Sequence, residues 1–363
     1  MQEFARSLDA LDSPRSGAAH RATRIPVWLD CDPGHDDAMA IILAAYDPRL
    51  QLLGISTVAG NQSVEKVTRN ALDILEFAGV EGVGVVMGQG RPLLRPSPIL
   101  CPEIHGDSGL DGPEGGPVLP HSDREPLAGK AAVVMAERIK GFLEEHPRTG
   151  PVRLVCTGAL TNAALMLALY PELRGSLEVV IMVVIMGGAL GIGNTGPVME
   201  FNIQTDPEAA KVVFEAGVQL AMVPIEVTHT ALATPDVLGR LLTSRPGVSK
   251  FKALVEQLLT FFAGTYREVF KFEDPPLHDP CAVAYVIDPS IFQVEEMRVD
   301  IETASSLSAG QTVCDVWHQS RRPKNCRVAR AMDVAAFWEL MISALDAADA
   351  ASPLGSGADP PLG

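Results

Sequence analysis

The sequence lacks several features that define other classes of protein. Its 6 cysteines are scattered without a CxxC pair or the close spacing of a zinc site, a pattern typical of reduced, packed thiols in a cytoplasmic protein. It has no dense basic cluster, and 45 acidic against 29 basic residues give a formal net charge of -16. We therefore expect neither nucleic acid nor an anionic membrane as a partner.

Neither a targeting segment nor a membrane-spanning segment is expected from the sequence. The first 24 residues mix arginines with acids and lack the apolar core of a secretory signal. Residues 179–199 carry no charge, but the continuous apolar run ends at Met186 and glycines follow from Gly187 onward. This arrangement indicates a buried strand and a glycine-rich loop, not a membrane-spanning helix.

From residue 25 onward, continuous apolar runs alternate with segments in which apolar residues recur at the spacing of a helix. Strands are expected at 25–29, 51–58 and 83–87, with a helix after each of the first two. This order predicts an α/β fold with an open, mostly parallel central sheet, helices on both faces and a Rossmann-like core. With 47% hydrophobic residues, the chain is long enough to bury a large core.

The rest of the chain continues in the same way and shows no internal repeat or linker. We expect a flexible extension over residues 1–21, a single domain over 22–348 and a disordered tail, rich in Ala, Pro, Gly and Ser, over 349–363. Further elements are expected as helices at 130–145, 160–169, 207–217, 248–270 and 334–347, and as strands at 152–156, 179–186, 220–223, 298–303 and 312–318.

Four carboxylates lie in residues 30–37, here called the acid turn, between the first expected strand and helix. They belong to Asp30, Asp32, Asp36 and Asp37, with a chain-breaking Pro-Gly pair in the middle. A helix N-terminus offers each nearby acid only about 0.3–1 kcal/mol, which does not offset their repulsion. A hard cation, Ca2+ or Mg2+, would offset it. The alternative is that an acid only caps the helix while its neighbours are solvated.

Other polar residues are expected at the same edge of the sheet. In open parallel sheets, ligands bind beyond the carboxyl ends of the strands, which gathers Asn61, Thr157, the loop 194–202 and His278 near the acid turn. No serine nucleophile motif or phosphate loop accompanies them, and carboxylates with amides suit a polyhydroxylated ligand such as a sugar. The proline-rich segment 88–127 is a candidate lid over this site.

The acid turn, Asp30-Cys-Asp32-Pro-Gly-His-Asp36-Asp37, resembles the DxDxxxDD signature of the inosine–uridine-preferring nucleoside hydrolases. Any one short block would be a weak match, but several occur in the family's order over roughly residues 24–345. The further blocks are Gly60-Asn61-Gln62, Ile104-His105-Gly106, Thr157-Gly158-Ala159-Leu160-Thr161-Asn162, Asn194, Glu200-Phe201-Asn202 and His278-Asp279-Pro280.

The resemblance implies a Ca2+-dependent enzyme that uses water to cleave the N-glycosidic bond of ribonucleosides, in nucleoside salvage, as a homodimer or homotetramer. It implies that the side chains of Asp32, Asp37 and Asp279 and the backbone carbonyl of Thr157 hold the cation. It also implies that Asp32 takes a proton from the attacking water and that Asp30 supports the loop.

The same resemblance assigns the ribose hydroxyls to five residues: Asp36, Asn61, Asn194, Glu200 and Asn202. On residue type alone, Asn194 and Asn202 could equally satisfy loop backbone, because Asn favours such turns.

The departing base must accept a proton, and three residues could supply it. We take His278 as the hypothesis, with Tyr266 as a second donor and His105 approaching from the candidate lid. A single histidine is more often packed or exposed than catalytic. By resemblance, His105 and His278 place the chain with base-nonspecific or pyrimidine-leaning members, and the aromatic Phe270 could stack on the base or simply fill space.

Two other functions compete with this hypothesis. One is a catalytically weak relative that only binds nucleosides or ribose, although every expected acid is present. The other is a Mg2+-dependent aspartyl phosphatase, which also places DxD after its first strand. That chemistry needs Thr or Val where this chain has Gly34, and it leaves the other acids unexplained.

Overall fold

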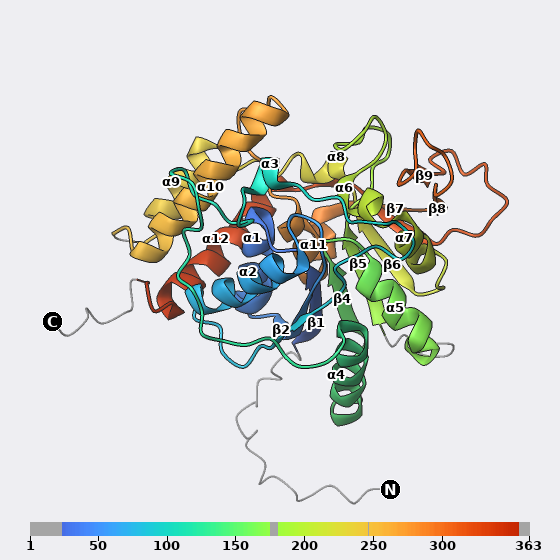
Figure 1. Ribbon diagram of the computed structural model, residues 1–363, viewed down its shortest axis with the longest axis horizontal. Coiled ribbons are helices and arrows are strands. Elements are labelled where there is room, and N and C mark those ends of the chain that lie inside the picture. Colours follow the sequence, from blue (N-terminus) through green and yellow to red (C-terminus); the bar gives the residue numbers. More distant parts are fainter. Residues whose placement is uncertain (1–23, 175–180, 246, 356–363) are drawn as a thin grey trace, which may run out of the picture.

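An eight-stranded sheet forms the centre of the computed structural model, which describes residues 24–174, 181–245 and 247–355. The strand order is β3-β2-β1-β4-β5-β6-β10-β7, and only the edge strand β7 runs antiparallel to its neighbour. This confirms the predicted α/β class (Figure 1). The strands are β1 Ile25–Cys31, β2 Leu50–Thr57, β3 Val85–Met87, β4 Val152–Cys156, β5 Ile181–Met186, β6 Gln219–Val223, β7 Phe292–Met297 and β10 Cys326–Met332, with β8 Val299–Ile301 and β9 Thr312–Cys314 as a separate antiparallel pair.

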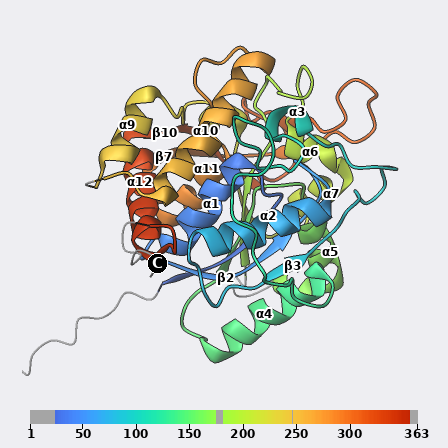
Figure 2. The ribbon, with the colours of Figure 1, turned by 60° about the vertical axis from the view of Figure 1, so that its left-hand side comes forward.

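Helices cover both faces of the sheet. Figures 1 and 2 show α4 at the lower end of the molecule and α3 at the upper end. The helices are α1 His35–Tyr46, α2 Val64–Phe77, α3 Pro102–His105, α4 Ala131–Glu145, α5 Thr161–Leu169, α6 Phe201–Thr205, α7 Pro207–Phe214, α8 Ile225–Thr228, α9 Pro235–Thr243, α10 Lys250–Val269, α11 Asp279–Ile287 and α12 Val334–Ala351, with 3-10 turns at Pro171–Arg174 and Pro289–Ile291.

Alternate side chains of each central strand enter two separate cores. Leu29 of β1 and Val184 of β5 pack into the core shared with α1, α2, α11 and α12, whereas Trp28 and Val183 pack into the core shared with α4, α5 and α7. Because successive strand residues point to opposite faces, a strand buried on both sides must be apolar along its whole length. Burial on both faces therefore explains why the central strands appear in the sequence as continuous apolar runs.

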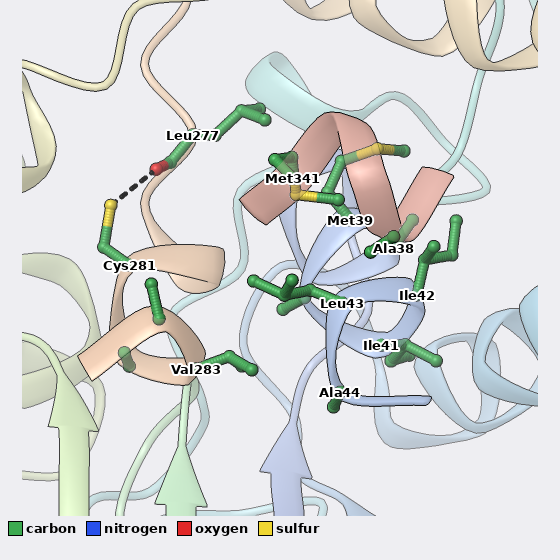
Figure 3. Packing of buried hydrophobic residues seen from close by; sticks show 14 of the residues in the cluster. Ala38, Met39, Ile41, Ile42, Leu43, Ala44, Leu277, Cys281, Val283 and Met341 are labelled. Atoms are coloured by element: carbon green, nitrogen blue, oxygen red, sulfur yellow. Dashed lines mark hydrogen bonds between the residues drawn. The ribbon is translucent and has the colours of Figure 1, made fainter. Parts of the chain in front are cut away.

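Helix α1 lies deep inside the first core and fixes the acid turn that precedes it. Its residues are buried from His35 to Ala44, and it packs against both α11 and α12. Figure 3 shows Met39 and Leu43 among side chains of the neighbouring helices, including Cys281 and Met341. Each fully buried Leu, Ile or Met contributes about 1.5–3 kcal/mol, so the start of this helix is rigidly placed.

The end of the chain differs from expectation. Helix α12 continues to Ala351, and Ser352 is buried, donating from Oγ to the Phe77 carbonyl at 2.6 Å. The carbonyl of Leu354 accepts from the Phe251 amide at 3.0 Å. The prediction that disorder begins at residue 349 is therefore wrong for residues 349–355, because this segment packs against α2 and α10 despite its small side chains.

Several expectations need smaller corrections, and some lie outside the described residues. Helices α9 and α11 and strands β7 and β10 were not anticipated, while the strands expected at 298–303 and 312–318 are shorter, as β8 and β9. The expected extension 1–21, residues 179–180 of an expected strand and the tail from 356 are not among the described residues. Within the described part, no helix combines the length and apolarity needed to cross a bilayer.

Candidate active site

A small cavity of about 60 Å³ lies beyond the carboxyl ends of β1, β2, β4 and β5, beneath α3. A larger hollow of about 590 Å³ lies near the start of β6 and β10, but its lining mixes basic side chains such as Arg298 and Arg322 with two glutamates and, among the described residues, includes no histidine. The smaller cavity is lined by Asp36, Asn61, Cys101, Ile104, His105, Thr157, Met186, Asn194, Thr195, Glu200, Phe201, Asn202, Phe262, Tyr266, Phe270, His278 and Asp279.

Three buried carboxylates meet at the floor of this cavity. Asp36 and Asp37 lie in the first turn of α1, and Asp279 is the first residue of α11. One oxygen from each lies within 4.8 Å of the others. Two helix N-termini therefore face one point, and their free N–H groups favour negative charge there.

Burial and mutual repulsion disfavour ionisation of this group. Burial, with the charge of Asp37, raises the pKa of Asp36 to about 7. Burial and the charges of Asp36 and Asp37 hold the pKa of Asp279 well above its usual range. Carboxyl oxygens this close together repel one another unless a proton is shared between them. A divalent cation would replace that proton, and oxygen donors of this kind fit Ca2+ or Mg2+.

Asp32 lies beside this group, wholly buried and beneath the cavity lining. Its Oδ2 accepts from the Asn61 amide at 2.8 Å, while its Oδ1 is enclosed and has no hydrogen-bond partner among the described residues. A Cβ on Gly60 would lie 2.0 Å from Oδ2, and one on Gly158 would lie 2.5 Å from Oδ1. Only glycine leaves room for this carboxylate, and its unpartnered oxygen is suited to a cation or a water molecule.

Polar side chains from three strand ends hold the carboxylates in place. Asn61 Nδ2 donates to the Asp32 carbonyl at 3.0 Å and to Asp37 Oδ2 at 3.1 Å. Thr157 Oγ1 donates to Asp37 Oδ1 at 2.9 Å. The Thr157 carbonyl accepts from Asn202 Nδ2 at 2.8 Å and keeps a second lone pair. The Thr157 side chain thus also contributes, which the sequence did not predict.

Asp30 lies deeper, at the end of β1. Its Oδ1 accepts from Ser56 Oγ and, at 2.8 Å, from Asn162 Nδ2. Burial raises its pKa to about 7. These contacts join β1, β2 and α5 below the site, which agrees with the supporting position expected for this acid.

The segment from Asn194 to Asn202 forms one wall of the cavity. Glu200 caps α6 by accepting from the amides of Asn202 at 3.0 Å and Ile203 at 3.2 Å, and it also accepts from Gly188 at 2.8 Å. Burial raises its pKa to about 7. Asn194 Oδ1 accepts from the Phe201 amide at 3.0 Å. These residues therefore shape the loop as well as line the cavity.

Tyr266 and His278 form a hydrogen-bonded pair that also lines the cavity. The Tyr266 hydroxyl lies 2.6 Å from His278 Nε2, and Thr228 Oγ1 lies 2.7 Å from His278 Nδ1. Burial holds the pKa of His278 well below, and that of Tyr266 well above, its usual range. Both groups are therefore neutral near pH 7.

His105 ends α3 and reaches the cavity from the candidate lid. Its ring stacks on His35 at 5.4 Å and on Phe262 at 5.4 Å between ring centroids. Burial and the neighbouring His35 hold the pKa of His105 well below its usual range. Segment 88–127 thus brings the expected histidine to the site.

The structure brings every predicted site residue into or directly beneath this cavity. Three further residues of the site, His35, Thr228 and Phe262, were not predicted from the sequence. Phe262 could have been predicted from the sequence, because it lies one helical turn before Tyr266 and two turns before Phe270, on the same face of α10. Thr228 could not have been predicted, because its role depends on the position of His278 in the folded chain.

This fold and this pocket define an α/β enzyme with a cluster of carboxylates that could hold a metal ion. The family model "Inosine-uridine preferring nucleoside hydrolase" matches residues 27–339. The chain belongs to this family, which confirms the resemblance and the expectation of an enzyme.

Individual relatives agree over almost their whole length. The chain is 45% identical over 328 residues to a "Probable ribonucleoside hydrolase" of Dictyostelium discoideum, covering 89% of this chain and 94% of the relative. It is 40% identical over 321 residues to a "Pyrimidine-specific ribonucleoside hydrolase RihA" of Shewanella sp. (strain ANA-3), covering 88% and 96%. A solved purine-preferring ribonucleoside hydrolase from Gardnerella vaginalis superimposes with a TM-score of 0.78 at 28% identity, covering 89% and 99%.

Proposed function

We propose that this protein hydrolyses the N-glycosidic bond of ribonucleosides of the uridine and inosine type, releasing ribose and the free base with the help of Ca2+. The observation that carries the proposal is the meeting of Asp36, Asp37 and Asp279 within 4.8 Å of one another at a cavity that Tyr266 and His278 also line. Acids would act on the sugar side, and neutral proton donors on the base side.

Ca2+ fits the donors on the acidic side. Asp32, Asp37, Asp279 and the Thr157 carbonyl would hold it, and Asp36 is close enough to join them. When bound, a divalent cation supplies positive charge that lowers the pKa of a water molecule and fixes sugar hydroxyls. Six to eight oxygen ligands are usual for Ca2+, so protein, ribose and water can all contribute.

The protein groups would then divide the remaining tasks. Asp32, whose pKa burial and the charge of Asp37 raise well above its usual range, would take the proton from the attacking water. Ribose hydroxyls would be bound by Asp36, Asn61, Asn194, Glu200 and Asn202. As the bond to the base stretches, C1′ gains positive charge, which the surrounding carboxylates and amide dipoles stabilise.

The departing base would receive its proton through the pair of Tyr266 and His278. Both ring nitrogens of His278 are hydrogen-bonded, so the Tyr266 hydroxyl would give its proton to the base, and His278 Nε2–H would stabilise the phenolate that this leaves until solvent returns the proton. This refines the hypothesis that His278 is the acid. Tyr266→Phe and His278→Ala should therefore each slow turnover of uridine.

The base preference is proposed to be broad or pyrimidine-leaning. One relative is named pyrimidine-specific and the structural neighbour is named purine-preferring, so the names favour neither extreme. We further propose that the enzyme serves nucleoside salvage in the cytoplasm as a homodimer or homotetramer, as the family resemblance implies.

The test is chromatographic measurement of base release by the purified chain. Uracil from uridine and hypoxanthine from inosine are the expected products, and Asp37→Asn should abolish both. The exposed Asp236→Asn provides a matched control that should behave as the native chain. Binding of both nucleosides without any base release would contradict the proposal and favour a binding-only protein.

A further inference from the structure

The glycine loop, defined here as residues 187–199 between β5 and α6, is tied at its start to a glutamate that the proposed function does not use. Glu226 Oε1 accepts from the Leu190 amide at 2.8 Å and from the Gly191 amide at 2.9 Å. Glu226 is half-buried on α8, and its Oε2 is enclosed without a hydrogen-bond partner among the described residues. In the described part of the chain, the two loop amides are therefore the groups that hydrogen-bond to this carboxyl.

The outer part of the glycine loop folds back on itself. The Gly193 amide donates to the Pro197 carbonyl at 3.1 Å, and the Asn194 amide donates to the Met199 carbonyl at 3.0 Å. Both hydrogen bonds join residues within the loop, and Ile192, just before them, is 77% exposed. The position of this outer part therefore depends on how the two ends of the loop are held.

Different side chains hold the two ends of the glycine loop. Beyond the far end, Glu200 caps α6 and also accepts from the Gly188 amide at 2.8 Å. At the near end, Thr312 of β9 is buried, and its Oγ1 accepts from the Ala189 amide at 2.9 Å. Glu226 accepts from the next two amides, so it is the last support before the outer part of the loop begins.

Asn194 belongs to the outer part of the loop and lines the cavity. Its Oδ1 accepts from the Phe201 amide at 3.0 Å, and its Nδ2 has no hydrogen-bond partner and is not enclosed among the described residues. The nitrogen of a carboxamide can only donate, so Nδ2 is suited to the oxygen of a ribose hydroxyl. A shift of the amides that Glu226 holds would move this donor, and a hydrogen bond weakens steeply as its distance and angle change.

We propose that Glu226, assisted by Thr312, is a positioning residue for ribose binding, which holds the start of the glycine loop where the Asn194 side-chain amide can donate to a ribose hydroxyl. This inference rests on the proposed function, in which Asn194 binds the ribose. Neither Glu226 nor Thr312 is among the described residues that line the cavity, so both act through the loop and not by touching the nucleoside.

A second route from Glu226 to the chemistry runs through α8. This helix also carries Thr228, whose Oγ1 lies 2.7 Å from His278 Nδ1. A displacement of α8 would disturb the proton supply to the departing base and lower kcat. A displacement of the glycine loop would instead weaken a contact that binds the sugar before and during the reaction, and would raise KM with little change in kcat. Kinetic constants therefore distinguish the two routes.

Ribose binding and uridine turnover by the Ca2+-loaded full chain test the inference. Glu226→Ala should raise the Kd for ribose, measured by titration calorimetry, and the KM for uridine about five- to tenfold, the effect of one hydrogen bond, with little change in kcat. Glu226→Gln, whose amide oxygen can still accept from both loop amides, should remain near the native values. Glu137→Ala, at an exposed site on α4, is the control and should behave as the native chain. A fall in kcat with unchanged KM would overturn the inference in favour of the route through α8.

A double-mutant cycle tests whether the effect passes through Asn194. In the Asn194→Ala protein, Glu226→Ala should add almost no further increase in KM, because the donor that Glu226 positions is gone. Among 2′-, 3′- and 5′-deoxyuridine, the analogue on which Asn194→Ala has no effect should also be the one on which Glu226→Ala has none. A full additional increase in KM in the double variant would overturn the inference.

The test remains decisive if one variant or the proposed function fails. If Glu226→Ala does not fold, Thr312→Val, which removes the contact with the Ala189 amide, decides the cycle with Asn194→Ala in the same way. If the native chain released no uracil from uridine, the proposed function would fail, while the Kd values for ribose of the same variants would still decide this inference. Equal Kd values in the native chain and in Glu226→Ala would overturn it.

Discussion

Removal of the cation should make the stability of this protein depend on pH in a characteristic way. The oxygens of Asp36, Asp37 and Asp279 lie within 4.8 Å of one another. At an effective dielectric constant near 20, each pair of ionised groups repels by at least about 3.5 kcal/mol, or about 10 kcal/mol for three pairs. That is comparable with the whole free energy of unfolding of a typical protein, about 5–15 kcal/mol. Without a cation, the group must therefore hold protons.

The direction of the pH effect follows from the raised pKa values. Asp36 has a pKa of about 7 in the folded chain against an ordinary value of 3.8, so the folded state binds more protons than the unfolded state between these pH values. Stability of the cation-free protein therefore falls as the pH rises from about 4 to 7. A cation competes with these protons, so its stabilising effect grows over the same range.

Thermal unfolding of chelator-treated protein at pH 5 and pH 7.5, with and without Ca2+, measures both effects. At 100 times its Kd, Ca2+ should stabilise by about 2.7 kcal/mol at pH 7.5, which raises Tm by about 5 °C at about 2 °C per kcal/mol. The increase should be smaller at pH 5 and absent in Asp279→Asn. The exposed Asp236→Asn is the control and should respond as the native chain. An equal Ca2+ effect at both pH values would refute the reasoning.

Three further predictions concern single residues. Gly60→Ala places a Cβ 2.0 Å from Asp32 Oδ2. It should lower kcat/KM for uridine at least about tenfold, because a displacement of 1 Å in an active site can cost that much. The control Gly141→Ala, whose new Cβ meets no atom within 4 Å, should leave kcat/KM unchanged. Glu200→Gln replaces an oxygen that accepts hydrogen bonds from the amides of Gly188 and Ile203. It should lower the free energy of unfolding, measured by denaturant titration, by about 1–3 kcal/mol. An unchanged unfolding midpoint would contradict this prediction. His278→Ala should lower kcat for uridine about 100- to 10,000-fold but much less for p-nitrophenyl riboside, whose leaving group needs no proton, and equal losses would argue against an acid role.

The sequence was sufficient for the centre of the fold because the central strands are apolar on both faces. The strand expected at 152–156 is β4 within the same bounds. By contrast, β7 and β10, at one end of the sheet, were missed because charged side chains interrupt both strands and leave no continuous apolar run. Helix α11 is hard to predict because Pro280 stands at its second residue; proline usually interrupts a helix but is well tolerated in the first turn.

The sequence predicted which residues belong to the candidate site better than it predicted which of those residues contact one another. The acid turn indicated a cation because four carboxylates in so short a stretch repel one another. The family resemblance implied a group of Asp32, Asp37 and Asp279, whereas in the structure the carboxyl oxygens of Asp36, Asp37 and Asp279 lie closest together. The pairing of His35 with His105 depends on the path of the irregular segment 88–127, and no periodicity in the sequence encodes that path.

The most direct test of the central claim is ribose release from a panel of nucleosides, measured with and without a chelator. Uridine, cytidine, inosine, adenosine and nicotinamide riboside should be tried, each with native protein, chelator-treated protein and treated protein resupplied with Ca2+. Ribose should appear from at least uridine or inosine, disappear after chelation and return with Ca2+. No ribose from any nucleoside in the presence of Ca2+, or undiminished release after chelation, would contradict the account.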